Sequence, residues 1–311
     1  AYDRETTRSN YMHRMNRLLE ICKTTSMHPI LQHPDTYYTP IREAYPNITT
    51  RKNAITLILS FFKHDPKLKD RYKDAHARWS KFHDDMDGLQ SAKYAKNMPD
   101  LKQLSKYTPM EEIQLKYREM KKGNPHETRA TSQYFVFLSI LLNTPPKRSD
   151  YGQMRIYYVT DPNKTDENYL VLREKGQPSY MVFTKYKTSK EYMRVDEELN
   201  KTLYKDIVDS LRRHPRKHLF VTRTGDPFAS NDGFSKYVIK MFSKLFGRDT
   251  GVTMLRHVYI TEVVDANQMS IEERNDIAGH MLHSRALQEK YKWKKEAVCS
   301  AVRRLCKECS K

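Results

Sequence analysis

Apolar residues recur at helical spacing through the first third of the chain. One run extends from Tyr11 to Cys22, and a second extends from Ala54 to Phe62 behind the helix-capping pair Thr49-Thr50. A highly charged stretch, residues 67–96, follows with few large apolar residues. This pattern predicts a helical domain over residues 1–100.

The rest of the chain alternates between helical and strand-like patterns. Residues 98–109 contain helix-breaking prolines and are interpreted as a linker, after which helical spacing returns over 109–122 and 130–142. Four short runs separated by turn residues predict strands at 154–159, 169–172, 180–183 and 192–195. Helical patterns cover most of the remainder, including a basic tail helix over 294–304. We therefore expect a second domain over residues 108–311 and a mainly α fold with a small antiparallel β-sheet (α+β).

The charge balance of the chain indicates the kind of partner that it binds. The chain carries 56 Lys and Arg residues against 38 Asp and Glu residues, a formal net charge of +18. Such a surplus predicts an anionic partner, and nucleic acid is the first candidate because Lys and Arg that neutralise phosphates release counterions. A basic membrane-surface protein would show a basic amphipathic helix or a lipidation motif, and the sequence has neither. With no apolar run of transmembrane length and no signal peptide, we expect an intracellular protein that is not secreted.

Cysteine usage adds little. The four cysteines are too few for a disulfide framework in a chain of 311 residues. Three of them lie in the basic tail without a clear fourth ligand, which is a weak zinc signal, so we assign no metal site to Cys299, Cys306 and Cys309.

Five short segments between residues 145 and 291 occur in an order that points to one chemistry. They are Pro145-Pro146-Lys147-Arg148-Ser149-Asp150, Lys185-Tyr186-Lys187-Thr188-Ser189-Lys190, Thr253-Met254-Leu255-Arg256-His257, Met281-Leu282-His283-Ser284 and Tyr291. In order, spacing and expected secondary structure they resemble the tyrosine recombinase (phage-integrase-like) superfamily. More narrowly, they are similar to its divergent forms in eukaryote-associated mobile elements and large DNA viruses.

The resemblance implies a site-specific DNA recombinase or integrase. It would cleave and rejoin strands through a 3′-phosphotyrosine intermediate, without metal, ATP or another cofactor. Residues 1–100 would form a core-binding domain that clamps DNA, and residues 108–311 would form the catalytic domain with a C-terminal tail helix. The partner would be double-stranded DNA, and the acting form a homo-oligomer, a tetramer in the recombination synapse. The protein would work at DNA in the nucleus or at a viral replication site.

Two arginines suit the charge that a phosphodiester develops under attack. Negative charge builds on the non-bridging oxygens, and a guanidinium is always charged and binds two oxygens at once. The resemblance assigns this role to Arg148, which follows the helix stop at Pro145-Pro146, and to Arg256. The latter lies among apolar helical positions, where an unpaired charge would be costly.

A lysine, a histidine and a tyrosine complete the expected site. Lys187 lies on a turn between two strand-like runs, where the family has its general acid. Lys185 and Lys190 on the same turn are alternatives, and otherwise contacts for DNA phosphates. His283 would hydrogen-bond the phosphate or orient the nucleophile, and Tyr291, eight residues later, would be that nucleophile.

Two departures from the family pattern leave alternatives open. The family commonly has glycine before the histidine, whereas Leu282 stands there, so His280 after Gly279 competes with His283. Where the family most often has His or Lys, the chain has Thr253, whose hydroxyl donates a hydrogen bond but is a poor base. His257 and His280 are therefore auxiliary candidates for the general base.

Two other functions share parts of this pattern. A type IB DNA topoisomerase uses the same chemistry, but the segment from Thr253 to His257 and the tail beyond Tyr291 favour a recombinase. A catalytically impaired DNA-binding relative is the second alternative, and Thr253 is the main point in its favour. In the first domain, Arg51 and Lys52 are candidates for phosphate contact, with a solvated helix face as the alternative.

Overall fold

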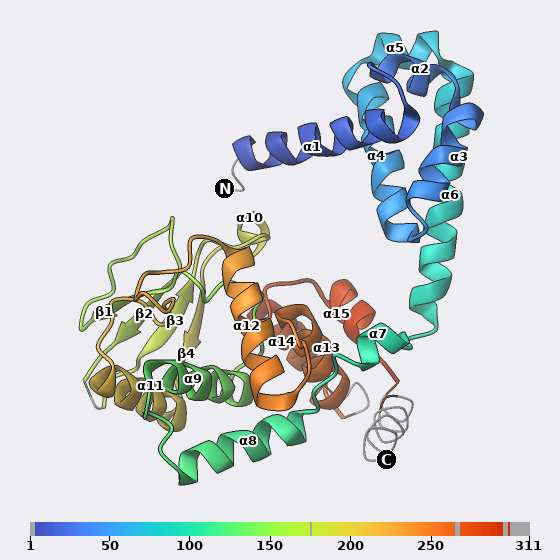
Figure 1. Ribbon diagram of the computed structural model, residues 1–311. Coiled ribbons are helices and arrows are strands. Elements are labelled where there is room, and N and C mark those ends of the chain that lie inside the picture. The colour runs from blue at the N-terminus through green and yellow to red at the C-terminus, as the bar shows by residue number, and fades with distance from the viewer. Residues whose placement is uncertain (1–3, 175, 265–267, 295–297, 299–311) are drawn as a thin grey trace. The chain divides into compact units, whose positions relative to one another are not determined.

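A computed structural model describes residues 4–174, 176–264, 268–294 and 298. The chain divides into two compact units, residues 1–96 and residues 97–311 (Figure 1). Each unit is described by itself below. The expected tail helix over 294–304, with Cys299, Cys306 and Cys309, lies almost wholly outside the described residues.

The first unit is helical throughout its described part, as the spacing of apolar residues predicts. Its helices are α1 (Arg4–Cys22), α2 (Met27–Gln32), α3 (Pro34–Ala44), α4 (Ile48–His64), α5 (Pro66–Arg71) and α6 (Lys73–Ala95). The indole of Trp79 is fully buried among Leu18, Ile58 and Phe62, and its N–H donates to the carbonyl of Ile30 at 3.1 Å. Burial of these side chains holds the helices together.

The start of α4 differs from the expected cap at Thr49-Thr50. Asn47 caps the helix instead, because its side-chain oxygen accepts from the backbone N–H groups of both threonines at 2.9 and 3.2 Å. In the first turn, Arg51 donates to the carbonyls of Tyr45 and Pro46, and Lys52 pairs with Asp87. Both candidate phosphate contacts therefore have partners within the unit, and their contact with DNA stays a prediction.

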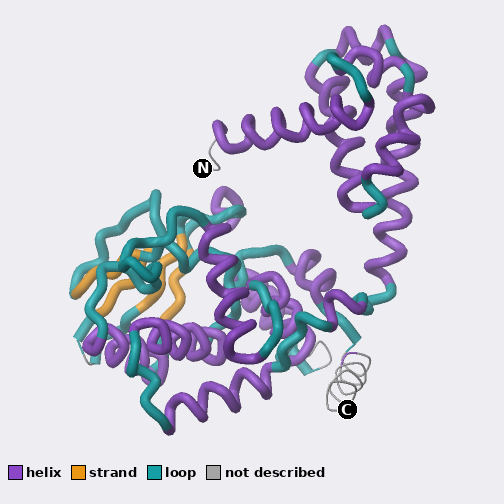
Figure 2. The backbone as a smooth tube through the Cα atoms, viewed as in Figure 1, coloured by secondary structure: helices purple, strands orange, loops and turns teal. Residues whose placement is uncertain are grey.

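The second unit combines helices with a four-stranded sheet, shown in orange in Figure 2. The strands are β1 (Arg155–Tyr158), β2 (Tyr169–Leu172), β3 (Tyr180–Phe183) and β4 (Val195–Glu198), in the order β1-β2-β3-β4. The helices are α7 (Leu101–Leu104), α8 (Met110–Lys122), α9 (Arg129–Asn143), α10 (Ser189–Tyr192), α11 (Lys201–Arg213), α12 (Asn231–Phe246), α13 (Val252–Glu262), α14 (Ile271–His280) and α15 (Arg285–Tyr291). The expected α+β class is confirmed.

Two details of the sheet correct the expectation. The sheet is mixed rather than antiparallel throughout, because β1 pairs with β2 in parallel while β2–β3 and β3–β4 are antiparallel. Residues 159–168 join the end of β1 to the start of β2. The last strand begins at Val195, because residues 189–192 form the short helix α10.

Helices α9 and α11 cover one face of the sheet (Figure 1). Buried Phe137 of α9 and Leu203 of α11 belong to the same core as Leu170 of β2 and Phe183 of β3. This layer supports the segments that follow α9 and β3, which carry two of the expected site residues, Arg148 and Lys187.

The segment expected to be a linker packs against the second unit. Tyr107 donates to the carboxylate of Glu262 in α13 at 2.6 Å, and the Thr108 hydroxyl lies 2.7 Å from that of Thr250. No helix in the part of the chain that the structure describes is long and apolar enough to cross a membrane.

Candidate active site

Arg256 is the centre of the candidate site. Its side chain projects from α13 and is fully buried. One terminal nitrogen donates to the carbonyls of Pro146 and Met281 at 3.2 and 2.8 Å, and the other donates to Nδ1 of His283 at 2.6 Å. The pKa of Arg256 is lowered to about 10, mainly by burial. This value is still well above 7, so the guanidinium is charged at neutral pH. The Arg256 side chain thus joins α13 to the segment of Pro146 and to the segment of Met281 and His283.

These contacts determine where His283 carries its proton. A guanidinium can only donate, so Nδ1 must accept and the proton lies on Nε2. Burial and the nearby Arg256 lower the pKa of His283 to about 3, which keeps the ring neutral. Its Nε2 is buried and has no partner among the described residues, and the same holds for Nε of Arg256. Two buried N–H groups are thus available to an acceptor that enters the site.

Tyr291 ends α15 beside this pair. The guanidinium carbon of Arg256 lies 5.2 Å from the centroid of the Tyr291 ring, and the ring of His283 lies 5.7 Å from it. The ring of His257 is closer still, with centroids 4.6 Å apart. The Tyr291 side chain is only half-buried, so a ligand can reach it.

His257 holds the backbone at Tyr291. Its Nδ1–H donates to the Tyr291 carbonyl at 2.8 Å, and its ring stacks on Trp293 with centroids 4.2 Å apart. Burial is the main cause that lowers the pKa of His257 to about 4, so Nε2 carries a lone pair at neutral pH. Among Thr253, His257 and His280, only His257 has a ring contact with Tyr291 in the described structure.

The turn before α15 uses an unusual residue. Leu282 has a φ of 57°, in the left-handed region that favours glycine. Its side chain is 1% exposed and belongs to the main core, and this burial offsets a strain of roughly 1–2 kcal/mol. Ser284 then caps α15 by accepting from the Leu287 N–H at 3.3 Å. Leu282 therefore adopts a backbone conformation that glycine favours while its side chain packs in the core.

Arg148 lies within electrostatic reach of this centre. Its positive charge lowers the pKa of His283 and opposes the burial that raises the pKa of Asp150. The Arg148 side chain is partly exposed, and its guanidinium has no hydrogen bond or ion pair to another described residue. Its whole guanidinium is therefore free to bind an external anion, whereas the terminal nitrogens of Arg256 already donate to groups of the protein.

The turn that carries Lys187 is attached to the same place. The hydroxyl of Thr188 donates to the carbonyl of Leu282 at 3.0 Å, which joins this turn to the residue before His283. Lys187 itself is exposed, as are Lys185 and Lys190. The structure therefore brings Arg148, Lys187, Arg256, His283 and Tyr291 to one region of the second unit.

The competing histidine, His280, has a different environment. Its Nδ1–H donates to Glu197 of β4 at 2.9 Å, and this hydrogen bond is the main cause that raises the pKa of His280. Glu197 also pairs with Lys147, which is buried beside Arg148. Sequence reasoning missed Lys147 and Glu197, because Glu197 has acidic neighbours and nothing local marks it as buried. Within the described residues, no group of three or more His, Cys, Asp or Glu side chains is arranged to hold a metal ion.

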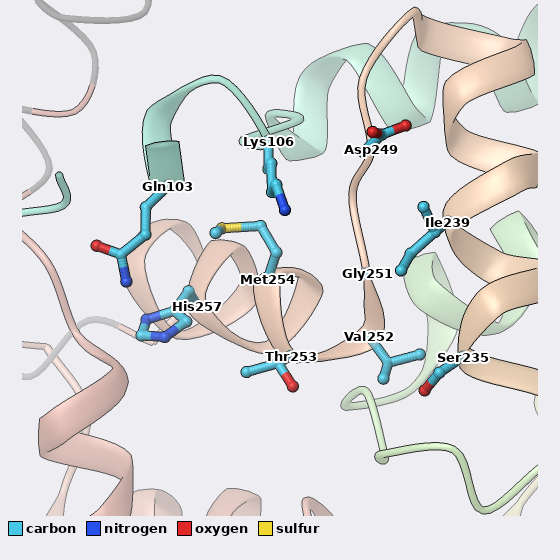
Figure 3. Close-up of a pocket in the computed structure, with 10 residues that line it drawn as sticks. All are labelled: Gln103, Lys106, Ser235, Ile239, Asp249, Gly251, Val252, Thr253, Met254 and His257. Atoms are coloured by element: carbon cyan, nitrogen blue, oxygen red, sulfur yellow. The ribbon is translucent and has the colours of Figure 1, made fainter. Parts of the chain in front are cut away.

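Thr253 lines an open pocket of about 300 Å³ at the start of α13. Figure 3 shows its lining, which includes His257, Ser235 of α12, and Lys106 from the segment after α7. The Ser235 hydroxyl lies 2.6 Å from that of Ser149, the neighbour of Arg148. The pocket is therefore adjacent to the candidate site and belongs to it.

Comparisons with known proteins add a distant structural likeness. No protein-family model and no curated protein matches the chain. Among solved structures, the crystal structure of XerA recombinase is similar with 14% sequence identity and a TM-score of 0.41. The aligned region covers 99% of this chain and 93% of that chain. At this distance, the function has to be inferred from the side-chain geometry.

Proposed function

We propose that this chain is a tyrosine-type site-specific DNA recombinase whose nucleophile is Tyr291. The observation that carries the proposal is the junction of Arg256, His283 and Tyr291 from separate elements. The arginine supplies fixed positive charge, the histidine supplies an unused buried N–H, and the half-buried tyrosine supplies a hydroxyl next to both. The net charge of +18 suits a DNA partner.

The reaction follows from these groups. The Tyr291 oxygen attacks phosphorus and forms a phosphotyrosine ester, while the bond from phosphorus to the 5′ oxygen breaks. Negative charge on the non-bridging oxygens is stabilised by Arg148 and Arg256, and Nε2–H of His283 donates to one of these oxygens. Rejoining reverses these steps with a 5′ hydroxyl as the attacking group.

Two protons must move. Lys187 protonates the departing 5′ oxygen, since its turn is tied through Thr188 to the residue before His283. Nε2 of His257 is the candidate acceptor for the Tyr291 proton, because its ring contacts that tyrosine and keeps a lone pair. Its low pKa makes it a weak base, so we expect His257 to help modestly and mainly to position Tyr291.

The test is covalent trapping. Nicked duplexes made from a random pool and from the terminal sequences of the encoding genetic element are incubated with the protein, and adducts that survive detergent are counted. Tyr291→Phe should form no adduct and bind DNA nearly normally. Tyr259→Phe, which removes another partly buried tyrosine hydroxyl of the same unit, should leave adducts intact.

Either of two results would contradict the proposal. Adducts that persist in Tyr291→Phe would exclude this nucleophile. DNA binding by the wild type with no adduct from any duplex would favour a DNA-binding relative. Transfer of the trapped strand to a second duplex distinguishes a recombinase from an enzyme that only relaxes supercoils.

A further inference from the structure

Asn168, the residue before β2, uses its whole side-chain amide on two segments of the candidate site. Its Nδ2 donates to the carbonyls of Asp150 and Lys185 at 3.1 and 2.9 Å. Its Oδ1 accepts from the backbone N–H groups of Thr184 and Lys185 at 3.0 and 2.8 Å. An asparagine amide has two donor hydrogens and two acceptor lone pairs, so every one of them is used.

The four backbone groups that Asn168 contacts lie close in sequence to Arg148 and Lys187, two proposed functional residues. Asp150 lies two residues after Arg148, and Lys185 lies two residues before Lys187. Asn168 is 9% exposed, so water does not readily replace these hydrogen bonds. Its own position is fixed by the strand that starts at Tyr169, which is fully buried.

We propose that Asn168 is a positioning residue that fixes the turn of Lys187 relative to the segment of Arg148. The inference rests on the proposed function, because it assigns Lys187 the proton transfer that Asn168 supports. Asn168 touches neither DNA nor the reacting atoms in this proposal. It acts through the backbone at Lys185.

The other attachments of the turn leave this role to Asn168. Thr188 joins the far side of the turn to Leu282, and Arg194 beyond it pairs with Asp161 and Asp196. Neither contact involves the segment of Arg148, and Lys147 of that segment contacts the strands beside the turn, at the Phe183 ring and at Glu197, rather than the turn itself. Among the described residues, the amide of Asn168 is the side chain that hydrogen-bonds both segments.

A misplaced general acid has a characteristic effect. Displacement of a catalytic group by about 1 Å costs on the order of 100-fold in rate. The loss of cleavage rate should appear in the step that needs the proton, and it should disappear when the leaving group can depart without a proton. A purely structural residue would instead slow ordinary and proton-independent cleavage alike.

The experiment compares a nicked duplex carrying the ordinary 5′ oxygen with one carrying 5′ sulfur at the scissile position. Asn168→Ala should slow cleavage of the ordinary duplex at least about tenfold and cleave the sulfur duplex at nearly the wild-type rate. Asn168→Asp is nearly isosteric and places a carboxylate against two carbonyl oxygens, so it should show the same cleavage rates as Asn168→Ala. It replaces the alanine variant in the experiment if that variant fails to fold. In a Lys187→Ala background, Asn168→Ala should add no further loss on the ordinary duplex.

Gln133→Ala is the matched control. Gln133 of α9 is another buried amide of the second unit, and it accepts from the Val221 N–H at 2.6 Å. Its loss should lower the melting temperature while leaving the ratio of sulfur to oxygen cleavage at the wild-type value. An unchanged ratio in both Asn168 variants, or an additive loss with Lys187→Ala, would overturn the inference. Failure of the wild type to form a Tyr291-dependent adduct would instead overturn the proposed function.

Discussion

Replacing Arg256 by alanine should separate the structural and chemical roles of this side chain. The change removes the donors that serve Pro146, Met281 and His283. A buried acceptor left unpaired costs about 1–3 kcal/mol. The variant also no longer buries a charge, which stabilises the folded state. Burial lowers the pKa of the guanidinium to about 10, and this shift corresponds to roughly 3 kcal/mol.

The balance predicts a folded but weakened variant. Three orphaned acceptors outweigh the relieved charge by roughly 0–6 kcal/mol, and the midpoint of about 3 kcal/mol corresponds to a fall in melting temperature of about 6–12 °C for a unit of this size. Cleavage should fall by roughly 100-fold to 1,000-fold, the scale for loss of one donor to transition-state charge. Arg148→Ala should cost similar activity with little change in melting temperature, because its guanidinium has no hydrogen bond to another described residue.

The assay is single-turnover adduct formation on a nicked duplex, measured below the melting temperature of each variant, with DNA binding measured in parallel. If Arg256→Ala folds, binds DNA and forms adducts within about threefold of the wild-type rate, Arg256 does not stabilise the transition state. A large loss of stability for Arg148→Ala would show that its guanidinium has an internal structural role.

Three further outcomes are expected. Lys187→Ala should cleave ordinary DNA at least about 100-fold more slowly than the wild type and recover with a 5′-sulfur leaving group. Lys190→Ala should show a small, salt-dependent defect. Equal behaviour of the two variants would refute the assignment of Lys187 as the general acid. Cleavage should continue in excess EDTA, because arginines supply the positive charge, and loss that magnesium restores would contradict this chemistry. The raised pKa of His280 beside Glu197 contributes stability that is present at low pH and lost as pH rises through that raised value. Melting temperature should therefore fall more between pH 6 and 8 in the wild type than in His280→Gln, and parallel curves would refute the linkage.

Local patterns in the sequence predicted much of the secondary structure near the site, although the run 192–195 is not a strand but the end of α10 and the start of β4. Strands β2 and β3 match the predicted runs, because short apolar runs that contain aromatic and β-branched residues and lie between turn residues favour strands. The apolar neighbours of Arg256 predicted that it lies on a buried helix face, and it is fully buried. The order of residue types was the basis for the proposed chemistry, which stays a prediction, since phosphodiester cleavage by tyrosine requires a nucleophile, positive charge and a proton donor.

Contacts between distant segments were decided only by tertiary structure. The parallel pairing of β1 with β2, the buried pair of Lys147 with Glu197, and the left-handed turn at Leu282 have no local signature. Asn168 looks like an ordinary turn residue in the sequence, yet its partners lie 16 to 18 residues away. Periodicity and capping encode the conformation of neighbouring residues, whereas the choice of partner for a buried polar group depends on the path of the whole chain, because each such group must find a hydrogen bond wherever the fold places it.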